Sequence, residues 1–579
     1  MRIRRVDIKN FRGIKNLSWL LPGDQGFLCL IGPGDSTKST ILEAIHYALS
    51  DRWSIPFADT DFYGANIDEP IVIRVTLTEL PDDVVHSNVL GFELSGINAD
   101  GALLHDPEDG SETCLVVQLK IDRNLEPQWT IYREGGSEPE TPLRSGTRRK
   151  FSAFKVDERI DGHLRWTRTS ALGRITETSH GAAGTLAHAT RISRQAVTEA
   201  VTEEMKELTD KVRDRLQTLG SGGFANLQPG LDTSLSSTSG VLALFEGEVP
   251  LTNYGLGSRR LAGLATQQLA YEDRAIVLVD EIEYGLEPHR LVYLLNQLRQ
   301  SSDVAQVLVT THSPVAVEQL DAADLAVVRA VDGEVTVHML RKFGDDIQPM
   351  LRAKPSAFLA RKVVLGEGRT EYGMLDSLVA QWDAERLGSG QPPAAALGVA
   401  FAHGDGGQQT AQRATKLIAA GYDSAILVDC DDPGATSAIA DAEAAGAGVV
   451  RWSDPHCTES ALCDGLDADA LTALIQLGTA LRASEATVRD DLNAHHSGTI
   501  TALDVSQWVS NGELDLEGAR SLVGRTAKKR EWFKSIPNGQ ALGEFVWQQR
   551  ELLDSTEFGS KLRDIKHQVY GAEPAEADD

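Results

Sequence analysis

Short apolar runs that end in polar or acidic residues recur along this chain and predict buried parallel strands. Residues 27–31, 275–279 and 304–310 form such runs in the first part of the chain, and residues 362–366 and 424–428 in the second. Runs of this length fit strands that helices cover on both faces. The carboxyl ends of such strands meet at one edge of a sheet, where α/β proteins bind ligands. The pattern therefore predicts an α/β protein, and the residues that follow each run are the candidates for chemistry.

Two other patterns divide the chain further. The first 20 residues alternate between apolar and polar side chains and predict a β-rich opening. From about residue 182 to residue 219, apolar residues recur at helical spacing with charges between them, which predicts a long amphipathic helix or a helical hairpin. Both dimerisation and core packing fit such an insert. We expect residues 1–180 and 226–350 to form one ATPase head, residues 181–225 a helical insert and candidate dimerisation element, and residues 356–579 a second domain.

Composition and charge narrow the class of protein. The 579 residues are 41% apolar and 24% charged, which fits a globular protein of about two to four domains. No stretch approaches the ~18 apolar residues of a membrane span, and no signal-peptide core follows Met1, so we expect a cytoplasmic protein without a membrane partner. The five scattered cysteines favour buried thiols over disulfides or a zinc site. The net charge of −28 disfavours a uniformly basic surface, although residues 144–150 and 525–534 are locally basic.

The segment after residues 27–31 has the composition of a phosphate-binding loop. A strand, a glycine-rich turn, a Lys-Ser pair and a helix follow one another, which is the context that such a loop requires. Backbone N–H groups would surround the phosphates, Lys38 would reach the terminal phosphates and Ser39 would ligate Mg²⁺. Thr37 replaces the glycine that usually precedes the lysine, so we expect slow hydrolysis. The residues expected to bind nucleotide here are Gly32, Gly34, Asp35, Thr37, Lys38, Ser39 and Thr40.

Two further strand ends carry residues suited to nucleotide chemistry. Asp280 and Glu281 follow residues 275–279, and paired carboxylates at such a place can hold Mg²⁺ and orient a water molecule. His312 lies at the end of the strand predicted over residues 304–310, where it is placed to contact a γ-phosphate. Upstream, a helix start offers N–H groups and a hydroxyl to a phosphate from a neighbouring subunit. The residues of that helix start are Gly255, Gly257 and Ser258.

Together these motifs resemble the ABC-type ATPase head shared by chromosome-maintenance and DNA-repair proteins. Asn10-Phe11-Arg12-Gly13 is similar to the opening of the DNA-associated branch and not to that of the transporter branch. The resemblance implies that ATP binds between two heads, with Lys38 of one facing Ser258 of the other, so that the protein is at least a dimer. It also implies that Asp280 supports the Mg²⁺ and that Glu281 orients the hydrolytic water. The segments that carry it are residues 32–40, 255–260, 275–281, 285–289 and 310–314.

The second domain repeats the design of an apolar strand that ends in acidic residues. One such strand leads to Glu367, and Glu371 follows across the start of a helix. Another leads to Asp429 and Asp431, which face the same side because alternate residues of a strand do so. Carboxylates at the ends of neighbouring parallel strands form an oxygen-only site suited to Mg²⁺ or Mn²⁺, and such ions support phosphodiester cleavage. For either acidic pair alone, solvated turn residues are the alternative.

The order strand, Glu-Gly-x-x-Glu, strand, Asp-x-Asp resembles a Toprim domain of primases, topoisomerases and some nucleases. An ABC-type head followed by a Toprim domain resembles the overcoming-lysogenization-defect (OLD) family of nucleases, which includes the nuclease subunit of the Gabija anti-phage system. The resemblance spans nearly the whole chain. It implies a further acid, matched by Glu459, and a late lysine that assists at the phosphate, matched by Lys529 with Lys528 as a substitute. A Gabija-type protein would also have a helicase-like partner.

We therefore expect an ABC-type ATPase head with a helical insert, followed by a Toprim nuclease domain with a helical extension. The expected activity is ATP-regulated, Mg²⁺- or Mn²⁺-dependent cleavage of DNA by a homo-dimer or tetramer, in anti-phage defence or DNA processing. The alternative from another class is a DNA-binding structural or repair ATPase whose Toprim domain does not cleave. A primase would need zinc-ribbon cysteine pairs, and a topoisomerase a further tyrosine-bearing domain. The expected catalytic residues are Glu281, Glu367, Asp429 and Lys529, and the expected metal ligands are Ser39, Glu367, Glu371, Asp429, Asp431 and Glu459.

Overall fold

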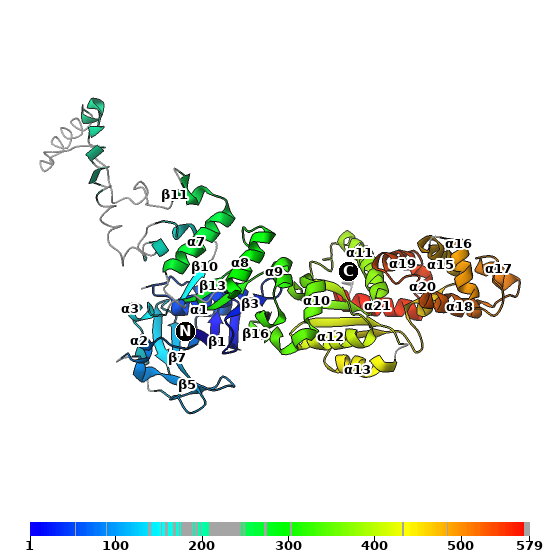
Figure 1. Ribbon diagram of the computed structural model, residues 1–579, viewed down its shortest axis with the longest axis horizontal. Helices are drawn as coiled ribbons and strands as arrows, with labels where there is room; N and C mark the ends of the chain where they lie inside the picture. Colours follow the sequence, from blue (N-terminus) through cyan, green and yellow to red (C-terminus); the bar gives the residue numbers. More distant parts are fainter. Residues whose placement is uncertain are drawn as a thin grey trace, which may run out of the picture.

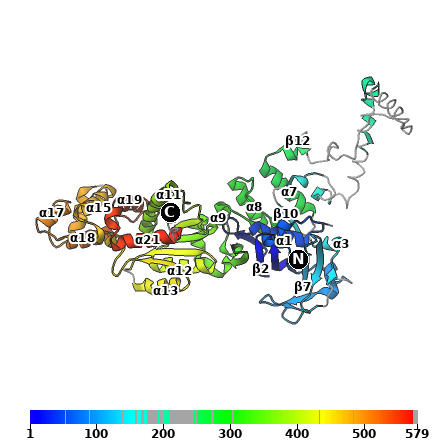
Figure 2. The same ribbon diagram turned by 180° about the vertical axis from the view of Figure 1, so that it is seen from behind.

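The computed structural model consists of two parts that lie side by side along the long axis, the first drawn blue to green and the second light green to red (Figures 1 and 2). Each part is built on a β-sheet with flanking helices, which confirms the predicted α/β class. Among the helices in the described ranges, none is long and apolar enough for a membrane crossing. The structure describes residues 1–579 except residues 53, 88–89, 137–139, 152, 157–159, 166–169, 173, 175–187, 189–190, 193–194, 197–198, 208–244, 247–248, 271–274, 301–303, 431–432, 483 and 572–579.

The first part, which we call the head, contains a 14-stranded sheet. Five of its strands are parallel neighbours in the order β10-β13-β14-β3-β15. Strand β14 therefore lies between β3, which leads into the phosphate loop, and β13, which leads to Asp280. This order brings three strand ends with chemical side chains to one edge of the sheet. The bounds of these strands are β3 Phe27–Ile31, β10 Ala153–Val156, β13 Ala275–Val279, β14 Val304–Thr310 and β15 Leu325–Val331.

The rest of the sheet is mainly antiparallel, and β1, β2 and β4 form the β-rich opening that the alternating pattern predicts. Its strands are β1 Arg2–Phe11, β2 Ile14–Leu20, β4 Ile71–Thr78, β5 Ser95–Ile97, β6 Leu103–Leu104, β7 Glu112–Ile121, β8 Pro127–Tyr132, β9 Thr141–Pro142 and β16 Glu334–Met339. A separate pair is formed by β11 Phe245–Glu246 and β12 Val249–Pro250. The head helices are α1 Lys38–Leu49, α2 Asp82–Val85, α3 Ser145–Arg148, α7 Leu256–Ala270, α8 Pro288–Gln300, α9 Pro314–Gln319 and α10 Gln348–Ala353. Most of the predicted helical insert, residues 181–225, lies outside the described residues.

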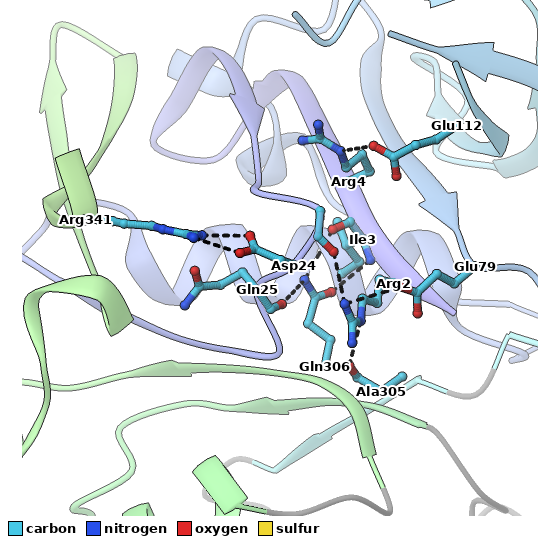
Figure 3. A network of polar contacts seen from close by, with 11 residues as sticks. Arg2, Ile3, Arg4, Asp24, Gln25, Glu79, Glu112, Ala305, Gln306 and Arg341 are labelled. Atoms are coloured by element: carbon cyan, nitrogen blue, oxygen red, sulfur yellow. Dashed lines mark hydrogen bonds and ion pairs between the residues drawn. The ribbon is translucent and has the colours of Figure 1, made fainter. Parts of the chain in front are cut away.

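A buried amide links β14 to the start of β1, two strands that are not neighbours in the sheet (Figure 3). Gln306, on β14, is fully buried, and its side chain accepts a hydrogen bond from the backbone N–H of Ile3 at 2.8 Å. The same amide donates to the carbonyl oxygens of Ile3 at 3.3 Å and Gln25 at 3.2 Å. At the rim of this network Arg341 makes a two-bond ion pair with Asp24. Gln306 thus takes the place of a neighbouring strand for the start of β1.

Replacing Gln306 with leucine is expected to lower the free energy of unfolding of the head by about 3 kcal/mol. The change keeps the volume but leaves the buried backbone groups of Ile3 and Gln25 without these partners, and each unsatisfied buried group costs roughly 1–3 kcal/mol. Urea unfolding measures the loss. Gln297→Leu on the exposed face of α8 is the matched control and should change the value by less than about 0.5 kcal/mol. Equal stability of the two variants would contradict the role of the buried amide.

The second part holds a four-stranded, fully parallel sheet in the order β18-β17-β19-β20. Its strands are β17 Lys362–Gly366, β18 Val399–His403, β19 Asp423–Val428 and β20 Gly448–Arg451. The helices are α11 Arg369–Gly388, α12 Gly407–Ala419, α13 Thr436–Ala444, α14 Thr458–Gly465, α15 Ala468–Leu481, α16 Glu485–Asn493, α17 Val505–Ser510, α18 Leu516–Lys529, α19 Ile536–Gln548, α20 Arg550–Leu553 and α21 Glu557–Tyr570. Helices α15 to α18 extend the second part at the end away from the head (Figure 1).

The two parts meet through β15 and the turn between α12 and β19. The guanidinium of Arg329, on β15, lies 4.2 Å from the centre of the Tyr422 ring, and the Tyr422 hydroxyl donates to the carbonyl oxygen of Phe358 at 2.7 Å. One buried apolar cluster continues from Val327 in the head through Phe358 to Ile426 in the second part. The strand next to β3 therefore contacts the turn that leads into β19 of the second sheet.

Candidate functional site

The phosphate loop closes around its own lysine. Lys38 is buried, and its ammonium group donates to the carbonyl oxygens of Gly32 at 3.1 Å and Pro33 at 2.8 Å and to the hydroxyl of Ser36 at 3.0 Å. Burial lowers the pKa of Lys38 to about 8, although the carboxylates around it, Asp280 foremost, act in the opposite direction. The ammonium is therefore held at the mouth of the loop by weak, exchangeable acceptors, as a phosphate-binding group needs to be.

Thr37 occupies the backbone conformation that usually favours glycine. Its φ is +68°, and it stands as the N-cap of α1 without a side-chain cap hydrogen bond. A β-branched residue in this region costs of order 1–3 kcal/mol. Gly13 makes room for the side chain, since a Cβ at Gly13 would lie 3.1 Å from Thr37 Cγ2. The loop thus keeps the phosphate-binding backbone despite the substitution, and the N–H groups at the start of α1 carry no side-chain cap.

Asp280 gathers hydroxyl groups and a lysine at the carboxyl end of β13. Its Oδ1 accepts from the hydroxyls of Ser39 and Thr310, both at 2.7 Å, and its Oδ2 lies 3.5 Å from the ammonium of Lys155. The predicted phosphate-loop serine and the predicted acid are therefore in direct contact. Sequence reasoning missed Lys155, whose side chain is almost fully buried, because it lies on the short strand β10, which no apolar run or motif marks.

Glu281 and His312 lie at neighbouring strand ends. Glu281 has a φ of +46°, and its N–H donates to the Thr310 hydroxyl at 2.7 Å, so the backbone turns sharply at this carboxylate. Glu283 accepts from the backbone N–H of His312 and from the Thr311 hydroxyl, both at 2.6 Å. Burial and the charge of Lys38 lower the pKa of His312, so its ring is neutral at pH 7. Glu283, which the sequence did not single out, is thus the residue that orients the histidine loop.

The helix predicted to open at Gly255, Gly257 and Ser258 is present in the structure. Helix α7 starts at Leu256, so Gly257 and Ser258 already belong to its first turn. A Cβ at Gly257 would lie 2.4 Å from the carbonyl oxygen of Gly285, so this position requires glycine. Arg260 donates to the carbonyl oxygens of Tyr284 and Asp280. The helix start is therefore fixed to the loop after β13, while Gly255 and Ser258 remain exposed.

A second group of acidic residues lies where β17 and β19 end side by side. The N–H of Glu367 donates to the carbonyl oxygen of Leu427, and the N–H of Asp429 donates to Glu367 Oε2 at 2.7 Å. Glu371 Oε2 accepts from the N–H of Gly368 at 2.8 Å at the start of α11. Glu367 is thus hydrogen-bonded to β19 and to the backbone of Asp429. Glu371 lies nearby in the first turn of α11. This is the arrangement expected from the strand-end pattern.

Helix α14 brings a further acid to the same place. Thr458 donates to Asp429 Oδ1 from its N–H at 3.0 Å and from its hydroxyl at 3.2 Å. Glu459, the next residue, is buried, and burial together with the charge of Glu371 raises its pKa to about 7. Burial and the charges of Glu371, Glu367 and Glu459 raise the pKa of Asp429 to about 8. Glu367, Glu371, Asp429 and Glu459, which we call the carboxylate cluster, therefore lie near enough to influence one another's charge.

The carboxylate cluster fits a divalent cation by its donors and by its charge. Its side chains offer oxygen ligands alone. Burial and mutual repulsion raise the pKa values of Asp429 and Glu367, and a hard cation would favour their charged forms. As they stand, no three Asp, Glu, His or Cys side chains among the described residues are close enough to hold an ion. Asp431, the remaining predicted ligand, lies outside the described residues.

The structure places Lys528, rather than Lys529, towards the carboxylate cluster. The positive charge of Lys528 lowers the pKa of both Glu367 and Asp429, against the effect of their burial. The charge of Lys529 instead acts on His495, at the end of α16. Sequence reasoning could not separate the two lysines, because adjacent helical residues differ only by a rotation of about 100° around an axis whose direction it did not fix.

Comparisons with known proteins show which family the chain belongs to and which proteins it resembles. A profile of the protein family described as "AAA domain, putative AbiEii toxin, Type IV TA system" matches residues 27–318. A protein of Thermus scotoductus (strain ATCC 700910 / SA-01) named "OLD nuclease" is 26% identical over 371 residues, which are 59% of this chain and 64% of that protein. The chain thus spans less than two thirds of the length of this curated relative.

Solved structures of SMC heads also align with the chain. The crystal structure of the SmcHead bound to the C-winged helix domain of ScpA is 16% identical, covers 59% of this chain and 99% of its own, and superposes with a TM-score of 0.34. The SMC head domain from Thermotoga maritima is 14% identical, covers 58% of this chain and 98% of its own, and has a TM-score of 0.28. Because both TM-scores are below 0.5, our description of the fold rests on the strand order of the two sheets and not on these superpositions.

Proposed function

Because this chain belongs to the protein family described as "AAA domain, putative AbiEii toxin, Type IV TA system", we propose that its ATPase domain regulates a second site that cleaves DNA with a divalent cation. The observation that carries the proposal is the carboxylate cluster, which gathers at the ends of parallel strands beside Lys528. Buried acids without compensating cations destabilise a fold, so their presence at a strand edge calls for a functional reason. The OLD nuclease relative supports the same reaction class.

In the ATPase site, the chain's own groups bind and orient the nucleotide phosphates. Lys38 exchanges the carbonyl oxygens of the loop for phosphate oxygens, and the N–H groups at the start of α1 bind the same phosphates. Asp280 holds the hydroxyl of Ser39, which would ligate the Mg²⁺ that accompanies ATP. Glu281, at the sharply turned strand end, orients the hydrolytic water. The strained Thr37 makes this site a slow hydrolase, suited to a switch.

In the second site, the carboxylate cluster, with Asp431 as the expected further ligand, would hold Mg²⁺ or Mn²⁺. A cation there activates water and offsets the charge that builds up on the phosphodiester. The chain supplies the geometry: Thr458 fixes Asp429, and the N–H of Asp429 fixes Glu367. Lys528 neutralises charge on the scissile phosphate or protonates the leaving oxygen. The role first expected of Lys529 thus passes to its neighbour in this proposal.

Strand β15 offers a short route between the two sites. A Cβ at Gly32, in the phosphate loop, would lie 2.6 Å from the carbonyl oxygen of Val328, so the loop and this strand are in close contact. Arg329, the next residue, packs on Tyr422 of the second part. A shift of the loop on nucleotide binding would therefore press on the second sheet through adjacent residues. Regulation in a homo-dimer or tetramer follows if Ser258 of one head contacts the nucleotide of another.

A plasmid-cleavage assay tests the proposal. Purified protein with Mg²⁺ or Mn²⁺ is expected to convert supercoiled plasmid to nicked or linear forms, and excess EDTA should abolish the conversion because the carboxylate cluster then lacks its cation. Addition of ATP or a non-hydrolysable analogue should change the rate. ATP turnover that DNA stimulates, with intact plasmid under every metal tested, would instead support a structural or repair ATPase. An anti-phage role and a helicase-like partner would be tested by infecting cells that carry the gene with and without its neighbours.

A further inference from the structure

A cationic surface extends from the carboxylate cluster along the end of α18. The segment from Arg525 to Lys534 carries five basic residues and one acidic residue, in a chain whose net charge is −28. The charge of Lys528 lowers the pKa of Asp429, and the charge of Lys534 lowers the pKa of Glu459, so both cations lie near these acids. The cations therefore begin at the site itself.

The packing of α18 fixes the position of these cations. A Cβ at Gly524 would lie 2.9 Å from the Cα of Ser460, so α18 lies directly on α14, which carries Glu459. At the other end of the segment, the indole N–H of Trp532 donates to buried Asp491, and Arg530 pairs with the same carboxylate at 3.4 Å. The basic surface is thus part of a rigid helical unit.

Two cations on the outer face of α18 continue the surface away from the cluster. Arg525 and Lys529 are exposed and one helical turn apart, so they lie on the same face with about 6 Å of axial rise between them. Arg525 donates to the carbonyl oxygen of His495 at 2.9 Å, and burial and the charges of Arg530, Lys529 and Arg525 lower the pKa of His495. Among the ion pairs of the described residues, neither Arg525 nor Lys529 has a carboxylate partner. Exposed cations that no acid neutralises are available to an external polyanion.

We infer that Arg525 and Lys529 bind the phosphate backbone of the DNA strand that leaves the carboxylate cluster, so that the substrate lies along α18 towards the end of α16. This inference rests on the proposed DNA cleavage and names the surface that positions its substrate. Figure 2 shows α18 at the end of the second part that is remote from the head, so DNA bound there would not pass over the head. Lys528, nearest the cluster, would contact the scissile phosphate, and the outer pair the phosphates beyond it.

The test measures DNA binding separately from cleavage. The full chain with Glu367→Gln, in EDTA, is titrated into labelled duplex and single-stranded DNA, and fluorescence anisotropy gives the dissociation constant at several salt concentrations. Adding Arg525→Ala and Lys529→Ala is expected to weaken binding about tenfold or more. The slope of log affinity against log salt should fall by about 1.8 for duplex or about 1.4 for a single strand, because two phosphate contacts are lost. The charge-preserving exchange Arg525→Lys with Lys529→Arg should restore binding.

Arg149→Ala with Lys150→Ala is the matched control, since it removes the same charge from the other basic stretch, where Asp51 and Asp83 are the respective partners. It should leave affinity and slope unchanged. An unchanged slope in the α18 variant, or equal competition by poly-glutamate and DNA, would overturn the inference. If the parent binds DNA through α18 but the unmodified protein cuts no plasmid with any metal, the proposed cleavage fails while the binding surface stands. If the α18 variant cleaves plasmid normally and its DNA binding is unchanged, the binding surface fails while the proposed cleavage stands.

Discussion

Replacing Asp429 with asparagine is expected to reduce DNA cleavage at least about 100-fold while nucleotide hydrolysis stays within about twofold. The amide keeps the shape of the side chain, and its oxygen can still accept from Thr458, but it removes a negative charge from the carboxylate cluster. The loss of charge weakens cation binding. The head does not share this site, so its turnover is unaffected. Initial rates of plasmid nicking and of phosphate release, measured on the same preparation, give both values.

Stability separates this effect from misfolding. Burial and three neighbouring carboxylates raise the pKa of Asp429 to about 8. A carboxyl whose pKa is higher in the folded than in the unfolded state lowers the stability of the protein as pH rises between the two values. Above about pH 4, ionisation of Asp429 therefore opposes folding in the absence of a cation. Asp429→Asn is therefore expected to melt no lower than the parent in EDTA at pH 8. The matched control is Asp441→Asn, on the exposed face of α13, which should cut DNA at the parental rate. Undiminished cutting by Asp429→Asn would remove the cluster from the mechanism.

The sequence predicted the positions of the strand ends well because that signal is local. An apolar run followed by acids needs no partner to be recognised, and the ends of β13, β17 and β19 carry Asp280, Glu367 and Asp429 as expected. The order of the strands was not predictable in the same way. That β14 pairs with β3 on one side depends on contact between segments 280 residues apart, which no local pattern specifies.

Residues that act through long-range contacts escaped the sequence reasoning. Lys155 reaches Asp280 from a strand on the far side of β13, and Thr458 holds Asp429 from a helix 29 positions along the chain. No motif marks Lys155, and the motif beside Thr458 points to Glu459 instead. Gly13 shows the same limit, since its need to be small becomes visible when Thr37 Cγ2 is found beside it. The small size of Gly13 thus accommodates the side chain of Thr37, and no local sequence pattern connects the two positions.

Replacing Lys38 with alanine is expected to abolish measurable ATP hydrolysis and to weaken ATP binding at least about tenfold. The ammonium is the buried cation of the phosphate loop, and alanine leaves the terminal phosphates to the backbone N–H groups alone. A nucleotide present at 100 times its dissociation constant stabilises a protein by about 2.7 kcal/mol, so the parent should show a clear rise in melting temperature with ATP that the variant lacks. Lys9→Ala, which removes an exposed lysine from β1, should behave as the parent does.

The same variant tests whether ATP is a regulator or a fuel for cleavage. The carboxylate cluster and Lys528 lie in the second part and contain no group of the phosphate loop. Lys38→Ala is therefore expected to cut plasmid at the rate that the parent shows without nucleotide, and ATP should no longer change that rate. If the β15 contact transmits the signal, Arg329→Ala should bind ATP normally and also lose the response, because it removes the guanidinium from Tyr422 without altering either site. Loss of all cutting in Lys38→Ala would mean that DNA cleavage requires ATP hydrolysis. The two sites would then act in one coupled reaction.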